Sequence, residues 1–369
     1  MSEATATTQR SALAKKQGVL VNQSKRWPHR PFRGRCVPSS FVLLSLLAIL
    51  LLPGAALGQA KSLRSATPDG ATLLEGVVLA PRHGLAYVMR PGGGIDAIEL
   101  ASGKVRWRSD RGAKPLTLAG DLLVAQAESR GNALDLVLLD ARSGAARDAM
   151  RMALPAGVAA TVTDTPAGSF RVQAAREASG LVVRWESVAA AGAAPAQGYL
   201  PAVNEGQAPS ASPTVVTGAA VIDLAAPSMR MQAEPTVVSG RSPTLKRASL
   251  EELQAPGSAA GRQFLSADGR HYLTSEPVKT TEFTLHQHRW TLYERASGAR
   301  LGSVPALVSA MPFLVVGKTL YHAAPAHVLL KEGKIAEQSA ALRAVNLATG
   351  AEKWSMAVRE TSFRGPFPP

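Results

Sequence analysis

The chain has 369 residues, of which 46% are hydrophobic and 18% are charged, and its formal net charge is +14. This composition excludes a disordered polyelectrolyte and a protein with many membrane spans, while the length allows one large domain or two ordinary ones. The single cysteine, Cys36, excludes a disulfide scaffold and a metal cage made of thiolates.

Residues 1–60 predict an export signal. They contain the apolar run FVLLSLLAILLL at 41–52, preceded by seven Lys or Arg residues from Lys15 to Arg35 and followed by small residues. The run is short for a membrane span and suits a signal peptide, and the basic residues hold the N-terminal side in the cytoplasm. An uncleaved inner-membrane anchor and a buried core helix are the alternatives. We expect a protein of the periplasm or cell envelope that contacts a membrane only through this segment.

Much of the positive charge belongs to this leader. Residues 1–60 carry eight Lys or Arg and one Asp or Glu, so residues 61–369 keep a net charge of +7. The remaining basic residues are scattered, without a basic run or interleaved aromatic residues, and we therefore expect no nucleic-acid binding.

The region 61–369 contains a repeated unit. Residues 95–107 read IDAIELASGKVRW and residues 342–354 read LRAVNLATGAEKW, and weaker copies occupy 135–148 and 290–302. All four copies place Ser or Thr directly before a glycine. The positions that define the repeat are Gly103, Gly144, Gly298 and Gly350, with a tryptophan four residues later in the first and last copies, Trp107 and Trp354.

Each copy predicts a β-hairpin. Alternating apolar residues form a strand, the glycine accepts a positive φ in the turn, and a second short strand follows. Further apolar strands are expected ahead of the hairpins, at 85–89, 121–126, 270–275 and 313–323. Val105 and Trp107 share one face of their strand, where the indole can wedge against the neighbouring unit.

This pattern resembles the repeats of the pyrroloquinoline-quinone-like β-propellers, the quinoprotein alcohol dehydrogenase-like superfamily. The resemblance covers about half of the region 61–369 and implies an all-β propeller of about five to seven four-stranded blades. Between the copies, 168–186 predicts one hairpin and 218–225 a strand. The Ala-, Pro-, Ser- and Gly-rich range 201–261 is expected to be an insertion or linker, with a short helix at 249–254.

The resemblance also implies what an enzyme of this superfamily would carry: a calcium site of carboxylate and amide ligands, a catalytic Asp, and in many members a vicinal cysteine pair. Residues 61–369 contain no cysteine. The acids Asp96, Asp135, Asp140, Asp223 and Asp268 form no cluster with ligand spacing, and we expect them at turns, loops and rims.

The sequence His286-Gln287-His288 is the most metal-like motif. On a strand, His286 and His288 point the same way and could hold one ion, with His271 or Glu282 completing the site. The competing interpretation, which we favour, is a pair of ordinary surface histidines.

The glycine-rich 91–94 joins two strands and does not open a helix, so we expect a loop and no phosphate cradle. The tail 363–369, FRGPFPP, is expected to pack on the domain or to be displayed to a partner.

We therefore expect a non-catalytic, monomeric binding or scaffold module that needs no cofactor and whose partner is another envelope protein. The alternative is a quinone- or metal-dependent oxidoreductase of the quinoprotein dehydrogenase type, with pyrroloquinoline quinone and calcium. A glycan-binding propeller is less favoured because aromatic residues make up 5% of the chain.

Overall fold

The fold is taken from a computed structural model of the chain. It describes residues 70–129, 131–165, 168–177, 180–189, 214–239, 244–245, 250–253, 262–278, 287–331 and 334–361. The chain divides into two units, 1–62 and 63–369, and the described residues belong to the second. In these ranges the regular elements are β-strands and one 3-10 turn, η1 (Pro81–His83), which confirms the all-β prediction. No helix of the described ranges is long and apolar enough to cross a membrane. The predicted leader and the tail 363–369 lie outside them.

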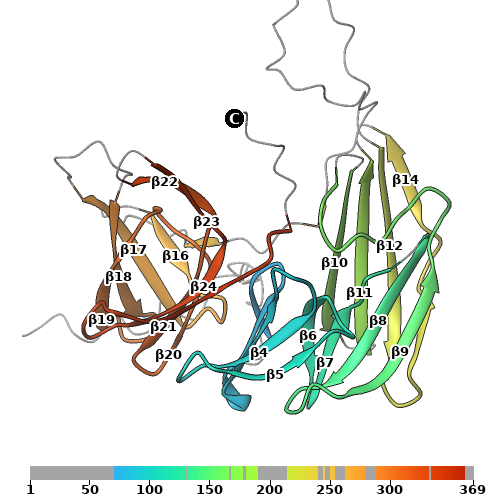
Figure 1. The fold of residues 1–369 in the computed structure, drawn as a ribbon, viewed down its shortest axis with the longest axis horizontal. Helices are drawn as coiled ribbons and strands as arrows, with labels where there is room; N and C mark the ends of the chain where they lie inside the picture. Colours follow the sequence, from blue (N-terminus) through green and yellow to red (C-terminus); the bar gives the residue numbers. More distant parts are fainter. Residues whose placement is uncertain are drawn as a thin grey trace, which may run out of the picture. The chain divides into compact units, whose positions relative to one another are not determined.

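The first nine strands form sheets A and B, and within each sheet every strand pairs with the next in antiparallel order (Figure 1). Sheet A contains β1 (Ala71–Leu74), β2 (Val77–Ala80), β3 (Leu85–Met89), β4 (Ile95–Glu99) and β5 (Val105–Ser109). Sheet B contains β6 (Lys114–Ala119), β7 (Leu122–Gln126), β8 (Ala133–Asp140) and β9 (Ala146–Ala153).

Sheets C and D follow the same meander, except that β13 and β14 both pair with β12. Sheet C contains β10 (Gly168–Glu177), β11 (Gly180–Ala189), β12 (Thr214–Asp223), β13 (Ser228–Met231) and β14 (Thr236–Ser239). Sheet D contains β15 (Glu251–Leu253), β16 (Gln263–Leu265), β17 (His271–Val278), β18 (Gln287–Glu294) and β19 (Arg300–Ala306).

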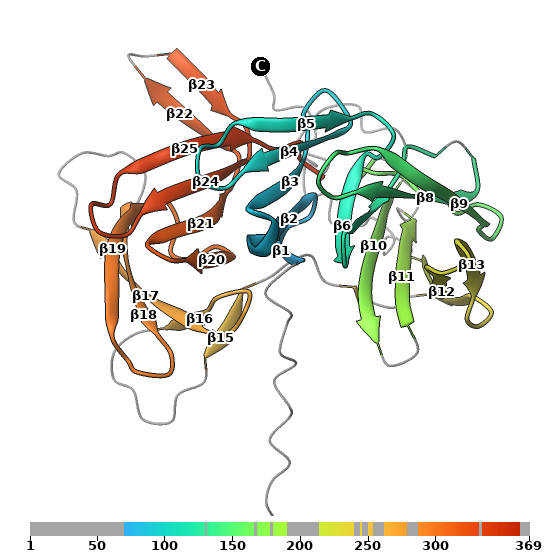
Figure 2. The ribbon, with the colours of Figure 1, turned by 90° about the horizontal axis from the view of Figure 1, so that it is seen from below.

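Sheet E is interrupted by a separate hairpin, seen beside it in Figure 2. Sheet E contains β20 (Phe313–Val316), β21 (Thr319–Ala324), β24 (Ala341–Asn346) and β25 (Glu352–Ala357), and the hairpin contains β22 (His327–Lys331) and β23 (Lys334–Gln338). The strands predicted at 85–89, 121–126, 270–275 and 313–323 are confirmed, as is the hairpin predicted at 168–186.

The sheets are buried on both faces where they meet their neighbours. In β8, Leu134, Leu136 and Leu138 pack into one apolar cluster with sheet C, while Val137 and Leu139 pack into a second cluster with sheet A. Alternate residues of a strand point to opposite faces, so one strand serves two cores. Two further clusters join sheet A to sheet E and sheet E to sheet D. In the described ranges, no apolar cluster joins sheet C to sheet D.

The four predicted glycine turns share one geometry. Gly103, Gly144, Gly298 and Gly350 have φ of 72°, 73°, 69° and 71°, and each donates its backbone N–H to the carbonyl four residues earlier. Each turn is followed by a bulge in the strand pairing. An L side chain is strained at these φ values, which is why the repeat requires glycine.

Two of these turns are covered by tryptophans from the neighbouring sheet, as the sequence predicts for Trp107. The Trp107 Nε1–H donates to the Ala141 carbonyl over 3.1 Å, and a Cβ on Gly144 would meet its ring at 2.5 Å. Likewise, Trp354 Nε1–H donates to the Leu100 carbonyl over 3.0 Å, and its ring covers Gly103. The two indole hydrogen bonds therefore join sheet E, which holds the last repeat, to sheet A, and sheet A to sheet B.

The joint between sheets D and E is built differently. Gly302 occupies the place that Trp107 and Trp354 take in their own copies, and a Cβ there would meet the Leu347 carbonyl oxygen at 2.1 Å. The two backbones approach directly, and no indole covers the turn glycine Gly350 of sheet E.

Of the predictions for 201–261, one needs correction and one is confirmed. The helix expected at 249–254 is wrong, because Glu251–Leu253 form β15 and pair with β16; the short segment satisfies its backbone groups across a sheet. The strand predicted at 218–225 within the expected insertion or linker is confirmed, because β12 pairs along the length of β11 and buries Val215 and Ile222. Residues 201–213 lie outside the described ranges.

The loop predicted at 91–94 is confirmed, since Gly93 and Gly94 turn between β3 and β4 with φ of 93° and 80°.

Candidate functional site

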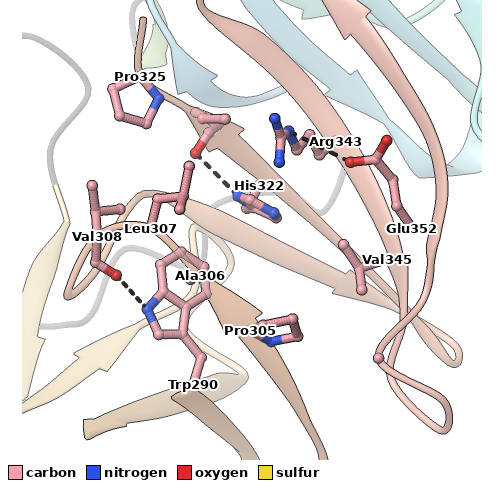
Figure 3. A pocket seen from close by; sticks show the side chains of 13 residues that line it. Trp290, Pro305, Ala306, Leu307, Val308, His322, Pro325, Arg343, Val345 and Glu352 are labelled. Carbon is pink, nitrogen blue, oxygen red and sulfur yellow. Dashed lines mark hydrogen bonds and ion pairs between the residues drawn. The ribbon is translucent and has the colours of Figure 1, made fainter. Parts of the chain in front are cut away.

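A cavity of about 440 Å³ lies between sheets D and E (Figure 3). Its volume is in the range of sites that hold small organic molecules. Most of the wall is apolar and comes from Trp290, Pro305, Leu307, Val308, Pro325 and Val345. The lining also reaches Gly350, the turn glycine that no tryptophan covers. Because residue 302 is glycine where the first and last repeats have tryptophan, no indole fills this space, and the cavity lies there.

Trp290 forms a fixed apolar wall. It lies on β18, is fully buried, and donates its Nε1–H to the Val308 carbonyl over 2.9 Å. This bond holds the ring and uses its polar atom, so the indole offers the cavity an apolar surface. The ring also meets His322 edge to face, with centroids 5.2 Å apart and an interplanar angle of 70°.

His322 is the buried polar group of the cavity. It lies on β21, is 7% exposed, and has its Nδ1 3.1 Å from the Ala323 carbonyl oxygen. Its Nε2 has no hydrogen-bond partner among the described residues. Burial, assisted by the nearby Arg343 cation and opposed by the Ala323 carbonyl, lowers the pKa of His322 to about 4. The imidazole is therefore neutral at neutral pH.

Arg343 and Glu352 complete the polar side. Arg343 on β24 is the cross-strand partner of His322, which places the two Cβ atoms on neighbouring strands about 5 Å apart. The Arg343 Nε lies 3.5 Å from Glu352 Oε2, and this buried nitrogen makes no hydrogen bond. Figure 3 shows the guanidinium beside the imidazole. The cavity therefore contains a hydrogen-bond acceptor without a protein partner, His322 Nε2, beside the Arg343 cation and its counter-ion Glu352.

Two of the histidines considered for a metal site, His288 and His271, lie far apart in the structure. His288 is half-buried, with its Nδ1 3.5 Å from Ser275 Oγ, and pairs across the sheet with Pro277. His271 pairs with Glu294, six residues along the strand from Pro277, or about 20 Å at the usual strand rise. His271 is therefore too far from His288 to bind the same metal ion. His286 and Glu282 lie outside the described residues.

Most of the candidate carboxylates serve strands and turns. Asp96, Asp135 and Asp140 form ion pairs with Arg108, Arg151 and Arg147 of the adjacent outer strand, at 3.4, 3.4 and 2.6 Å. Hydrogen bonds from Arg147 and Ser143 hold the pKa of Asp140 well below its usual range. Asp223 and Asp268 accept backbone N–H bonds within turns.

These donors do not fit the calcium that the family resemblance implies. Calcium takes six to eight oxygen ligands, whereas no group of three or more His, Cys, Asp or Glu that could hold a metal ion occurs in the described part of the chain. A second cavity of about 260 Å³ lies where β1, β6 and β10 approach, with Glu75, Lys114 and Gln173 in its lining. One carboxylate faces it, which is too few for a calcium site.

The sequence did not indicate His322, Arg343 or Glu352 as site residues. His322 occurs in the apolar strand sequence TLYHA, where one polar residue is a weak signal. Trp290 and His322 are far apart along the chain and meet through the packing of two sheets, which no local pattern reveals.

Comparison with known proteins yields remote structural similarity. No family model and no curated protein matches the sequence. The β-propeller domain of Cps50 (Swd1) from Myceliophteria thermophila is 10% identical, with a TM-score of 0.22, over 77% of this chain and 86% of that one. Sqt1 from Saccharomyces cerevisiae is 9% identical, with a TM-score of 0.29, over 79% and 87%. A europium-containing methanol dehydrogenase is 10% identical, with a TM-score of 0.22, over 78% and 69%. These values establish neither a family nor an activity for the chain.

Proposed function

We propose that this chain is a non-catalytic β-propeller that acts as an exported binding module of the cell envelope. The observation that carries the binding role is the cavity between sheets D and E, which combines apolar walls with a buried imidazole whose Nε2 has no protein partner in the described ranges. An imidazole nitrogen that lines a cavity and has no protein partner is open to a ligand that brings a hydrogen-bond donor.

The propeller interpretation is supported by the repeated sheets. Five consecutive four- or five-stranded sheets occur in the described ranges, and their order matches the order of the chain. The first strands β1, β6 and β10 approach one another, with β6 in contact with both, as the innermost strands of blades do. Five blades is the lower end of the predicted range of five to seven.

Export, monomeric state and an envelope protein partner complete the proposal. Export is supported by the signal-like segment 41–52 and is compatible with the absence of cysteine from 61–369. Fractionation with N-terminal sequencing of the mature protein tests export directly: a start near residue 60 in the periplasm supports it, and an intact leader on a cytoplasmic protein contradicts it.

The binding role is tested by calorimetric titration of the full chain with naphthalene, an apolar probe that fits the cavity volume. We expect saturable binding to the wild type and its loss in Leu307→Trp, which fills the cavity from its wall. A matched substitution on sheet B, Leu122→Trp, should leave binding unchanged. If the wild type binds neither naphthalene nor its hydroxylated analogues, the binding role is refuted, and unchanged binding in Leu307→Trp would contradict its assignment to this cavity.

The oxidoreductase alternative is the activity that the family resemblance implies, and we test it at the second cavity, whose lining includes Glu75 and the 2% exposed Lys114. It is tested by adding pyrroloquinoline quinone and calcium and following reduction of a dye with alcohol substrates. We expect neither saturable quinone binding nor dye reduction. Quinone-dependent reduction that is lost in Lys114→Met would favour the enzyme and refute the non-catalytic module.

A further inference from the structure

We propose that the cavity between sheets D and E binds a neutral small molecule with an aromatic or alicyclic body and one hydroxyl group. The hydroxyl donates its proton to His322 Nε2 and accepts a hydrogen bond from the Arg343 guanidinium. The inference rests on the proposed binding role of this cavity and names the chemical class of its ligand.

The donor requirement follows from the histidine tautomer. The Ala323 carbonyl, 3.1 Å from Nδ1, can only accept, so the hydrogen-bond network assigns the ring proton to Nδ1. Nε2 is then a lone-pair acceptor. A ligand that satisfies it must bring an O–H or N–H donor, and an ether, a ketone or a plain hydrocarbon does not.

The acceptor requirement follows from Arg343. Its side chain is 28% exposed, carries donors alone, and lies directly across the strand pair from His322. A hydroxyl placed between the two side chains serves both, because one oxygen can donate once and accept twice. A primary ammonium group satisfies His322 but meets the guanidinium with like charge.

The charge balance selects a neutral ligand. Glu352 Oε2 lies 3.5 Å from Arg343 Nε and compensates the cation at the cavity edge. A carboxylate ligand would bring a second anion beside Glu352 and would offer His322 Nε2 a lone pair where it needs a proton. Both contacts are repulsive in a partly desolvated site.

The apolar lining of the cavity determines the hydrocarbon part of the ligand. Trp290 presents its ring with the Nε1–H already bonded to Val308, and Pro305, Leu307, Pro325 and Val345 add aliphatic surface. Flat or cyclic hydrocarbon groups gain the most from such a surface, since they bury apolar area without losing internal freedom.

Three probes of one shape test this class by calorimetric titration of the full chain: 2-naphthol, naphthalene and 2-naphthoate. We expect 2-naphthol to bind about tenfold more tightly than naphthalene, the usual value of a hydrogen bond, and 2-naphthoate to bind most weakly. Equal affinity of 2-naphthol and naphthalene would refute the hydroxyl contact and leave the binding role intact. Binding of none of the three would refute both. Tighter binding of 2-naphthoate would refute the charge argument.

Variants locate the contact. In His322→Phe, 2-naphthol should lose its advantage over naphthalene, and in His288→Phe, a change outside the cavity lining on β18, the advantage should persist. Persistence of the advantage in His322→Phe would overturn the assignment. The second variant Arg343→Met covers the case in which His322→Phe does not fold: it removes one of the two hydrogen bonds and should reduce the preference for 2-naphthol, and an unchanged preference would count against the proposal.

Discussion

Gly144→Ala and Gly298→Ala separate backbone strain from packing at the repeat turns. Both glycines have the same conformation, with φ of 73° and 69°, so the left-handed backbone costs each alanine about 1 kcal/mol. A Cβ on Gly144 meets Trp107 Cε3 at 2.5 Å, whereas no atom lies within 4 Å of a Cβ on Gly298. Trp107 is held by its bond to Ala141 and does not swing away easily.

The clash adds the cost of overpacking, about 1–3 kcal/mol. We therefore expect Gly144→Ala to lower the free energy of unfolding by about 3 kcal/mol and Gly298→Ala by about 1 kcal/mol. Denaturant titration of the full chain, followed by fluorescence and circular dichroism, measures both.

A double-variant cycle isolates the contact. When Trp107 is already replaced by alanine, Gly144→Ala should cost only the backbone strain, about 1 kcal/mol. Equal losses for Gly144→Ala and Gly298→Ala in the wild-type background would refute the packing argument. So would an unchanged cost of Gly144→Ala after Trp107→Ala.

Three other predictions follow from buried groups. The Ala141 carbonyl accepts from both Tyr87 Oη at 2.9 Å and Trp107 Nε1 at 3.1 Å, so combining Tyr87→Phe with Trp107→Phe should lower stability by more than the sum of the single changes, by about 1–3 kcal/mol, and simple additivity would contradict this. The pKa of His322 falls from 6.5 unfolded to about 4 folded, so about 3 kcal/mol of stability present above pH 6.5 should be lost as the pH falls to 4. Denaturation of His322→Phe at both pH values should show that loss removed, and an equal pH dependence would refute it. Ile222→Ala, 2% exposed on β12, should cost about 2–4 kcal/mol in a thermal melt, whereas a change within 0.5 kcal/mol would mean that β12 contributes little to the core.

The local structure of the repeat could be predicted from the sequence because it depends on neighbouring residues. The Ser/Thr-Gly pairs at 102–103 and 349–350 fix the turn, since glycine alone accepts the required φ without strain. The spacing from Gly103 to Trp107 even indicated that the indole reaches the next unit, and the bond to Ala141 confirms it.

The middle of the chain was harder to predict because its signals are compositional. Glu251–Leu253 read as a helix from a capping pattern, yet pairing with β16 decides their conformation. The strand predicted at 218–225 is confirmed by β12, but its composition did not reveal that Gly218 is needed there because a Cβ would meet the Trp185 ring at 2.4 Å. Small residues that make room for a buried indole resemble linker residues in sequence.

The cavity could not be predicted because its parts come from different sheets. Gly302 was visible in the sequence as a repeat position without tryptophan, but not the consequence that the turn at Gly350 stays uncovered. The pairing of β21 with β24 brings His322 beside Arg343, and the packing of sheet D against sheet E adds Trp290.

The most direct test of the binding site is a nitrogen–proton NMR spectrum of the indole groups during titration with 2-naphthol. Single Trp→Phe variants assign the resonances. The Trp290 indole should shift progressively with the probe, because its ring forms the cavity wall, while those of Trp107 and Trp354 should stay in place. Shifts of Trp107 or Trp354 with an unmoved Trp290 would contradict the assignment of the cavity between sheets D and E as the binding site.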